Sequence, residues 1–416
     1  MTTELWLVVI YLVATGIADL QASKLGLTLG PVPVFLTDIT LFLLLVTSFV
    51  RWPSRILYWL SEGSGAGPVG RAVWLIIILA IVLFFMAVGE YLLFAVRDLA
   101  IFSYSLFYPL VYFAIRKRQD ALKLLRYFTY ASVIGAALLV LQETIGLDLG
   151  LFHPMTRVAL GRRFVALRSG DSDDPIFALV FLTVYALLDR KLRFLHMICV
   201  ILCCLSLAAS AARASVVAVV LAAGVTCYYV RGRQRLCFVL IGIVVVLAVV
   251  VAPMMPPNPA SKQLEHLRLS VISGAGGSSI DGNASFRTRR WQYAIDQWVE
   301  HPILGIGFGR QIIPSGLVDA TERKGEFNVG MPHNSLLFLG ARTGLIGFSL
   351  ILYSWLSAFK RLTVMFRRTR RVECLAVANI LAAMFGCAMF GLFIERPGSN
   401  ATFWIVLAIG SRLVEL

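Results

Sequence analysis

Charged residues are scarce in this chain, and acidic residues are scarcer than basic ones. Only 15% of the 416 residues are charged, with 23 acidic against 38 basic side chains, while 59% are hydrophobic and the mean hydropathy is +0.82. A soluble domain of this size could not bury so much apolar surface. The short alternating segments of a membrane β-barrel are also absent. Apolar stretches of about 20 residues, with charges gathered between them, instead predict an all-α integral membrane protein.

The sequence also lacks several features that would mark a cleaved signal peptide, a disulfide framework, a repeat protein or a dinucleotide-binding domain. The first apolar stretch, from Leu5 to about Asp19, has no basic segment before it and no small-residue cleavage site, so we expect a retained first span. None of the seven cysteines lies in the large polar segment of the chain, which predicts neither a disulfide framework nor a cysteine metal site. We find no internal repeat. The glycine-rich segment 305–309 follows no predicted strand, so it is no dinucleotide-binding fingerprint.

The apolar stretches predict about twelve transmembrane helices in two groups. Residues 1–252 hold the first nine, residues 253–332 form one large, partly helical loop, and residues 333–416 hold the last three. The expected spans are 4–21, 31–50, 72–90, 98–115, 127–145, 175–188, 194–210, 214–230, 236–252, 333–358, 373–393 and 399–414.

The basic residues between the spans predict the orientation. With a cytoplasmic N-terminus, every second loop carries a basic cluster on the inside, as the positive-inside rule requires. The clusters are Arg51/Arg55/Arg71, Arg116 to Arg126, Arg190 to Arg193, Arg231 to Arg235 and Lys360 to Arg371. Both termini are then cytoplasmic and the large loop is on the outside. The net charge of +15 is accounted for by these clusters facing anionic lipid, so it does not predict nucleic-acid binding.

The large exterior loop is too long for a simple connector and is expected to hold structure of its own. Apolar residues at helical spacing in 260–272 predict a helix on the membrane surface. A second helix is predicted from about Phe286 to Glu300, capped by Asn283 or Ser285 and ended by Pro302.

Several arginines lie on the side where the positive-inside rule disfavours them: Arg157, Arg162, Arg163, Arg168, Arg213, Arg287, Arg289 and Arg290. Long loops escape the rule, so ordinary solvated charge is the simpler interpretation of Arg289 and Arg290. Arg213 differs because it lies in a turn of a few residues between two spans. A charge at the end of a span is costly unless it is partnered or functional.

Arg287 is predicted to open a helix, where the macrodipole disfavours a cation. Free backbone N–H groups and an arginine together favour an anion site. Trp291, Ile295 and Trp298 follow on the same helical face, which we expect to pack against the membrane domain. Arg287 shares the helical face that would pack against the membrane domain, so we expect its side chain to point toward that domain.

Of the five histidines, His333 lies where the large loop re-enters the membrane, so it is either an interfacial anchor or a functional residue. His301 precedes a proline at a helix end, where a C-terminal cap is the simpler account. His196 is predicted on the cytoplasmic side. His153 lies in the first exterior loop and His266 on the surface helix.

Together and in order, several segments resemble the O-antigen ligase and polymerase superfamily of bacterial membrane enzymes. The segments are Arg-Ala-Ser at 213–215, Arg287 four residues before Trp291, His-Pro-Ile-Leu-Gly-Ile-Gly-Phe-Gly at 301–309, Pro-His-Asn-Ser-Leu at 332–336 and Gly-Ala-Arg-Thr-Gly-Leu-Ile-Gly at 340–347. Twelve spans with one dominant exterior loop look most like the O-antigen ligases of that superfamily.

The resemblance implies a glycosyltransferase architecture of the GT-C-like kind, in the bacterial inner membrane with a periplasmic active site. It implies transfer of glycan from an undecaprenyl-pyrophosphate-linked donor to a lipid A–core acceptor. By the same resemblance, His333 activates the acceptor hydroxyl while Arg213 and Arg287 hold the pyrophosphate. A neutral imidazole can accept the hydroxyl proton, and planar guanidinium groups bind the leaving group bidentately. Direct displacement would invert the anomeric carbon, and no cofactor is implied.

Four further residues are expected to bind substrate. Arg162 and Arg163 are assigned to phosphate contacts of the donor or acceptor, and Arg290 to substrate binding. Asn334 would orient His333 or a substrate hydroxyl, or else cap the next span. The acid-poor chain predicts no metal. Asp171, Asp173 and Asp174 are compatible with a divalent ion, but also with a loop that caps a span and balances Arg168.

Two other functions compete with the ligase. A polymerase would use the same donor with another lipid-linked glycan as acceptor, and no motif reports the acceptor. A lipid-linked-oligosaccharide transporter or flippase would need charges along a path between the two faces and usually shows repeat-related halves. Here the charges of interest gather at one face, which favours an enzyme.

Overall fold

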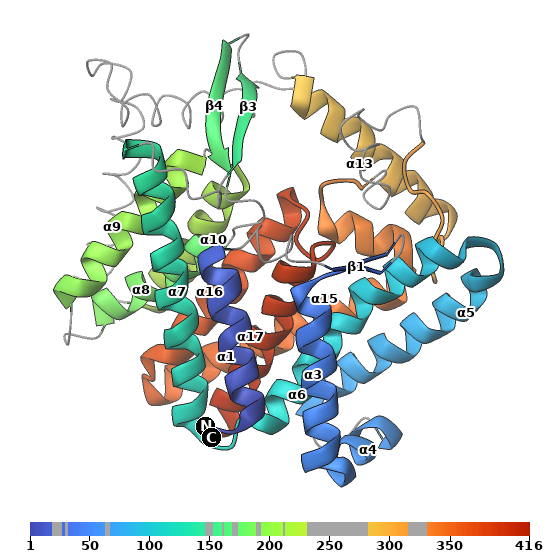
Figure 1. Ribbon diagram of the computed structural model, residues 1–416, viewed down its shortest axis with the longest axis horizontal. Coiled ribbons are helices and arrows are strands. Elements are labelled where there is room, and N and C mark those ends of the chain that lie inside the picture. The colour runs from blue at the N-terminus through green and yellow to red at the C-terminus, as the bar shows by residue number, and fades with distance from the viewer. Residues whose placement is uncertain are drawn as a thin grey trace.

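A computed structural model describes residues 1–18, 27–29, 32–62, 67–145, 153–159, 162–168, 174–188, 193–210, 213–230, 282–314 and 331–416. The predicted ninth span and the predicted surface helix at 260–272 lie outside these residues. The described residues form a helical bundle with two short β-hairpins (Figure 1).

Most of the described helices overlap the predicted spans. In chain order they are α1 (Thr3–Ala18), α3 (Leu36–Arg51), α4 (Pro53–Glu62), α5 (Gly67–Ser103), the 3-10 turn η1 (Tyr104–Leu106), α6 (Phe107–Ala114), α7 (Arg118–Ile145), α8 (Asp174–Leu188), α9 (Arg193–Ser210), α10 (Arg213–Tyr229), α13 (Gly282–Glu300), α15 (Ser335–Thr369), α16 (Val372–Phe390) and α17 (Pro397–Glu415).

Four of the described helical segments are long and apolar enough to cross a membrane: Gly67–Ala114, Arg118–Gln142, Ser335–Thr369 and Val372–Phe390. The bent pair α3 and α4 would make a fifth, and four shorter apolar helices accompany them. In the first segment the helix is interrupted at Tyr91 (φ −132°, ψ 35°), where the ribbon turns back on itself (Figure 1). That turn separates the two stretches predicted as spans 72–90 and 98–115. The full count of twelve spans stays a prediction.

Two features of the fold differ from the expectations. No strand was predicted, but β1 (Leu27–Leu29) pairs with β2 (Val32–Val34), and β3 (His153–Ala159) pairs with β4 (Arg162–Arg168), both antiparallel. The second hairpin occupies the predicted exterior loop 146–174. The basic stretch from Lys360 was predicted as a loop, yet α15 continues through it to Thr369, because lysine and arginine are good helix formers. The left-handed Arg370 (φ 57°) ends the helix.

The two ends of the bundle differ in chemistry. The chain termini lie together at one end, and the β3–β4 hairpin and α13 lie toward the other (Figure 1). At the end with the termini, Glu4 pairs with Arg51 at 3.8 Å, Arg118 pairs with Glu373, and Arg361 pairs with Glu415 at 3.1 Å. Basic residues that were predicted to be cytoplasmic therefore gather at one end, although the orientation itself stays a prediction.

Candidate active site at the loop end of the bundle

Helix α13 docks on the bundle through one face, as predicted. Arg287 is half-buried and its Nη1 donates to the carbonyl of Phe390 at the end of α16, at 3.1 Å. The Trp291 ring lies 6.1 Å from that of Phe390, and the Trp298 ring lies 5.0 Å from that of Phe348 on α15. Trp298 also contacts Gly340 so closely that a Cβ atom there would lie 2.3 Å from the indole. Arg287 therefore faces the bundle.

Three details of the α13 prediction were wrong. Ile295 is 39% exposed, and Ala294 is the buried residue beside it. The helix begins at Gly282, so Asn283 and Ser285 lie inside it and do not cap it. Arg287 is then the sixth residue, beyond the first four residues whose N–H groups lack intrahelical partners. Free helical N–H groups therefore cannot join Arg287 in an anion site, and any anion contact there depends on the guanidinium.

Arg290 is buried, which corrects its interpretation as solvated charge. The side chain has no solvent exposure, and Nη1 donates to the carbonyl of Met331 at 3.1 Å. A buried guanidinium needs hydrogen-bond acceptors, and here it ties α13 to the segment that leads into His333. Arg289, one residue earlier, is exposed as expected.

The backbone at His333 is unusual. His333 has φ 54°, in the left-handed region that few residues other than glycine adopt. The next residue, Asn334, is the N-cap of α15, and its Oδ1 accepts from the N–H groups of Leu336 and Leu337 at 3.0 and 3.1 Å. The capping alternative for Asn334 is thereby confirmed. The left-handed turn places a half-buried imidazole immediately before the helix begins.

The first turn of α15 is fixed to the loop that joins α16 to α17. Ser335 is fully buried, and its Oγ accepts from the N–H groups of Phe393 and Ile394 at 2.8 and 3.1 Å. The same hydroxyl donates to Glu395, whose carboxyl is 6% exposed. Burial raises the pKa of the Glu395 carboxyl from 4.5 to about 7, against the opposing influence of the Ser335 hydrogen bond and of Arg396. Ser335, two residues after His333, is therefore hydrogen-bonded to a buried acid.

The packing of α10 on α16 brings the Arg213 backbone to the same end. Asn379 Nδ2 donates to Thr226 Oγ1 at 2.7 Å, and a Cβ atom on Gly386 would lie 2.7 Å from Cα of Ala218. Residue numbers fall along α10 as they rise along α16, so the two helices are antiparallel. At about 1.5 Å per residue, Arg213 lies about 7.5 Å beyond Ala218, toward the end of α16 at Phe390. The predicted short turn before Arg213 is also confirmed, because α9 ends at Ser210.

The glycine-rich segment after α13 forms a clamp with α15. Helix α15 is broken at Gly344 (φ 60°, ψ −161°), where the N–H groups of Leu345 and Ile346 bond to the carbonyls of Pro302 and Ile303 at 2.8 and 3.3 Å. In return, the N–H groups of Ile306 and Gly307 bond to the carbonyls of Ala341 and Arg342 at 2.8 and 3.2 Å. Two sequence segments of the resemblance thus pair with each other and hold α13 in place.

A buried charge cluster closes this clamp against α5. Asp98 has no solvent exposure. Its carboxylate lies 2.6 Å from Arg97 Nη2 and 3.4 Å from Arg342 Nε. The carboxylate also accepts a hydrogen bond from the N–H of Gly309 at 2.8 Å. Arg342 Nη1 also donates to the carbonyl of Gly307 at 3.1 Å. Hydrogen bonds satisfy the Asp98 carboxylate and Arg342 Nη1, which helps such a buried pair to be tolerated, whereas Arg342 Nε contributes only the ion pair.

For the other residues considered in the sequence, the structure shows fewer contacts with this site. Arg162 and Arg163 begin strand β4, opposite Ala159 and Val158 of β3, in the hairpin at the loop end (Figure 1). His301 is exposed just after α13, and its carbonyl accepts from the Gly305 N–H at 3.0 Å. Among the described residues no group of three His, Cys, Asp or Glu side chains could hold a metal, and Asp171 and Asp173 lie outside them.

Sequence reasoning missed the loop of residues 391–396 and its acid. Glu395 lies between two apolar helices, where a polar turn would be the ordinary expectation, and no local pattern marks it. Only the pairing of Ser335 with the α16–α17 loop shows that this turn supports the start of α15. The raised pKa of Glu395 adds interest to this turn, because perturbed pKa values cluster at functional sites.

Residues 198–352 match the O-antigen ligase family. The matched segment includes Arg213, Arg287 and His333 as well as both halves of the glycine clamp. Comparison with curated proteins found no match.

The match indicates similarity to the O-antigen ligase and polymerase enzymes, which act on lipid-linked glycans. Together with the apolar helices, it supports a multi-pass membrane protein. The elements carrying the three predicted catalytic residues meet at one end of that bundle.

Proposed function

We propose that this protein is an O-antigen ligase of the bacterial inner membrane, with its active site at the periplasmic, loop end of the bundle. The donor would be glycan linked to undecaprenyl pyrophosphate and the acceptor a sugar hydroxyl of lipid A–core. The observation that carries the proposal is the convergence of α10, α13 and the start of α15 on residues 390–395. Arg287 and Ser335 both bond to that segment, and the register of α10 brings the Arg213 backbone to the same end of α16.

In the proposed reaction the acceptor oxygen attacks the anomeric carbon of the donor. The bond from that carbon to the phosphate oxygen breaks, and undecaprenyl pyrophosphate leaves with the bonding electrons. His333 accepts the hydroxyl proton, which a neutral imidazole can do near neutral pH. Arg287 and Arg213 stabilise the charge that grows on the pyrophosphate. Attack opposite the leaving group would invert the configuration, and the step requires no metal.

Supporting roles follow from the contacts. Asn334 caps α15, so its amide contributes to catalysis by fixing the turn at His333. Arg290 is hydrogen-bonded to Met331 and would position the same segment from the other side, in place of the direct substrate contact first expected. Arg162 and Arg163 remain candidates for phosphate contacts from the β3–β4 hairpin.

The decisive experiment is reconstitution of the purified protein in liposomes with the undecaprenyl-pyrophosphate-linked glycan, lipid A–core and a chelator. We expect glycan to appear on lipid A–core, as separated by gel electrophoresis. Longer glycan on the undecaprenyl carrier, with lipid A–core unchanged, would show a polymerase instead. Movement of intact donor across the bilayer without transfer would support a flippase and contradict the proposal.

A further inference from the structure

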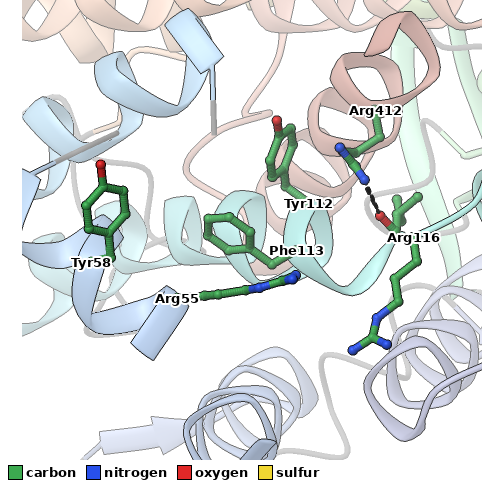
Figure 2. Close-up of a pocket in the computed structure, with 7 residues that line it drawn as sticks. Arg55, Tyr58, Tyr112, Phe113, Arg116 and Arg412 are labelled. Carbon is green, nitrogen blue, oxygen red and sulfur yellow. Dashed lines mark hydrogen bonds between the residues drawn. The ribbon is translucent and has the colours of Figure 1, made fainter. Parts of the chain in front are cut away.

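A second charged site lies at the other end of the molecule, beside the chain termini. A cavity of about 540 Å3 opens between α4, the end of α6 and the end of α17. It is lined by Arg55, Tyr58, Tyr112, Phe113, Ile115, Arg116 and Arg412 (Figure 2). Three arginines therefore surround one space, together with three aromatic rings and no carboxylate in the lining.

The three arginines are held in different ways. Arg412 is fixed, because its guanidinium donates to the carbonyl of Ile115 (Figure 2), from Nε at 3.0 Å and from Nη2 at 2.9 Å. Its Nη1 also lies 3.3 Å from Glu415. Arg116 lies over the Trp52 ring at 5.2 Å. Within the described part of the chain, neither Arg55 nor Arg116 forms an ion pair. Among the described residues, the charges of Arg55 and Arg116 are therefore not offset by an ion pair, whereas Arg412 contacts Glu415.

Helix α4, which forms one wall, has the features of a helix in the membrane interface. It turns by 112° from the apolar helix α3 at Trp52 and is amphipathic. Ile56 and Trp59 are buried, while Leu57 and Tyr58 are 56% and 51% exposed next to Arg55. Exposed leucine and tyrosine beside arginine are typical of the level where lipid headgroups meet the acyl chains.

We propose that this cavity binds the phosphate headgroup of an anionic phospholipid, in the leaflet opposite the candidate active site. Arg55 and Arg116 would contact the phosphate, and the fixed Arg412 would form the base of the site. Guanidinium groups suit phosphate because they donate two parallel hydrogen bonds. Basic pockets between membrane helices are known to take anionic headgroups. A soluble phosphate compound shares this chemistry, but the exposed apolar surface of α4 beside Arg55 favours a lipid.

The test uses the full chain in detergent, titrated with phosphatidylglycerol, with phosphatidylcholine of the same acyl chains, or with inorganic phosphate. Thermal melting gives the apparent affinity and native mass spectrometry counts the lipids retained. We expect phosphatidylglycerol alone to raise the melting temperature. The double variant Arg55→Gln/Arg116→Gln should weaken that affinity by about fivefold for each arginine removed.

The matched control is Arg71→Gln/Arg126→Gln, which removes two exposed arginines of the same predicted side that do not line the cavity. Its affinity for phosphatidylglycerol should stay within about twofold of the unmodified protein, since it leaves the cavity intact. An equal loss in both double variants would show diffuse surface charge and overturn the proposal. The same stabilisation by inorganic phosphate, lost in Arg55→Gln/Arg116→Gln, would overturn the lipid assignment in favour of a soluble ligand.

Discussion

Arg287 of α13 donates to the main-chain carbonyl of Phe390 at 3.1 Å, and this hydrogen bond connects the exterior loop to the last turn of α16. A carbonyl uses only part of the donor capacity of a guanidinium, which has five N–H groups in a planar fork. The bond fixes the direction of the side chain. Arg287 is thus held against the segment on which the proposed site is centred.

The first prediction concerns Arg287. Arg287→Ala should lower transfer by about 10²–10³-fold, because one stabiliser of the leaving-group charge is removed. Arg287→Lys should remain severely impaired, since a point charge does not reproduce a bidentate contact. The rate is measured in the reconstituted transfer assay, with thermal melting as a check on folding.

Arg289→Ala is the matched control for this variant, because it removes an exposed arginine from the same helix. Its transfer rate should be close to that of the unmodified protein. Equal losses in Arg287→Ala and Arg289→Ala would show that the net charge of α13 matters and that a specific contact does not.

Most of the helical framework could be predicted because its signals are local. The apolar stretches predicted the ends of α1, α3 and α7 to α10 to within a few residues, except the N-terminal ends of α3 and α7. The helical spacing of Trp291 and Trp298 identified the face of α13 that packs on the bundle. The cap at Asn334 was an alternative that residue type alone suggested. These features depend on neighbours within one or two turns, which the sequence displays directly.

What escaped prediction depends on contacts between distant segments. The segments 301–309 and 340–347 were recognised as motifs, but their pairing through Gly344 involves residues some forty positions apart. Asp98, from a third segment, forms an ion pair with Arg342 of this pairing. Glu395, from a fourth segment, accepts a hydrogen bond from Ser335 at the start of α15. The β3–β4 hairpin was missed because the segment was treated as a connector. No periodicity in a single sequence reports such partners.

The second prediction separates the imidazole of His333 from its backbone conformation. At φ 54°, alanine would be strained, whereas glycine adopts this region freely and asparagine tolerates it. If His333 is the general base, His333→Gly and His333→Asn should both fold and both lose transfer by about 10²–10⁴-fold. Added imidazole should partly restore His333→Gly. Normal turnover in either variant would remove the proposed base and leave His333 as a turn residue.

The third prediction tests the glycine clamp. In Gly344→Ala the new methyl group would lie 2.2 Å from the carbonyl oxygen of Ile303, at a φ of 60° with ψ −161°. We expect a loss of at least about 2 kcal/mol of stability from backbone strain alone, seen as a large fall in melting temperature. Gly305→Ala, where the methyl would lie 2.5 Å from the Ala341 carbonyl oxygen, should behave in the same way.

The control for the clamp is Gly224→Ala in α10, which meets nothing within 4 Å. Alanine in a helix interior is favoured over glycine by about 0.5–1 kcal/mol, so this variant should melt slightly higher. If Gly344→Ala melts like Gly224→Ala, α13 is not held by the pairing of the two motifs.

The last prediction follows from the buried acid at the start of α15. The pKa of Glu395 is raised by burial from 4.5 to about 7, so the folded protein binds a proton that the unfolded chain releases in that interval. The contribution of this group to the free energy of unfolding is therefore complete below pH 4.5 and is lost as the pH rises to 7, by about 3 kcal/mol in total.

Glu395→Gln, which copies the neutral carboxyl beside Ser335, should melt higher than the unmodified protein at pH 8 and similarly at pH 5. Glu300→Gln, which removes an exposed carboxylate of α13, should leave the pH dependence unchanged. A pH dependence that persists unchanged in Glu395→Gln would show that other groups cause it and would contradict the raised pKa of Glu395.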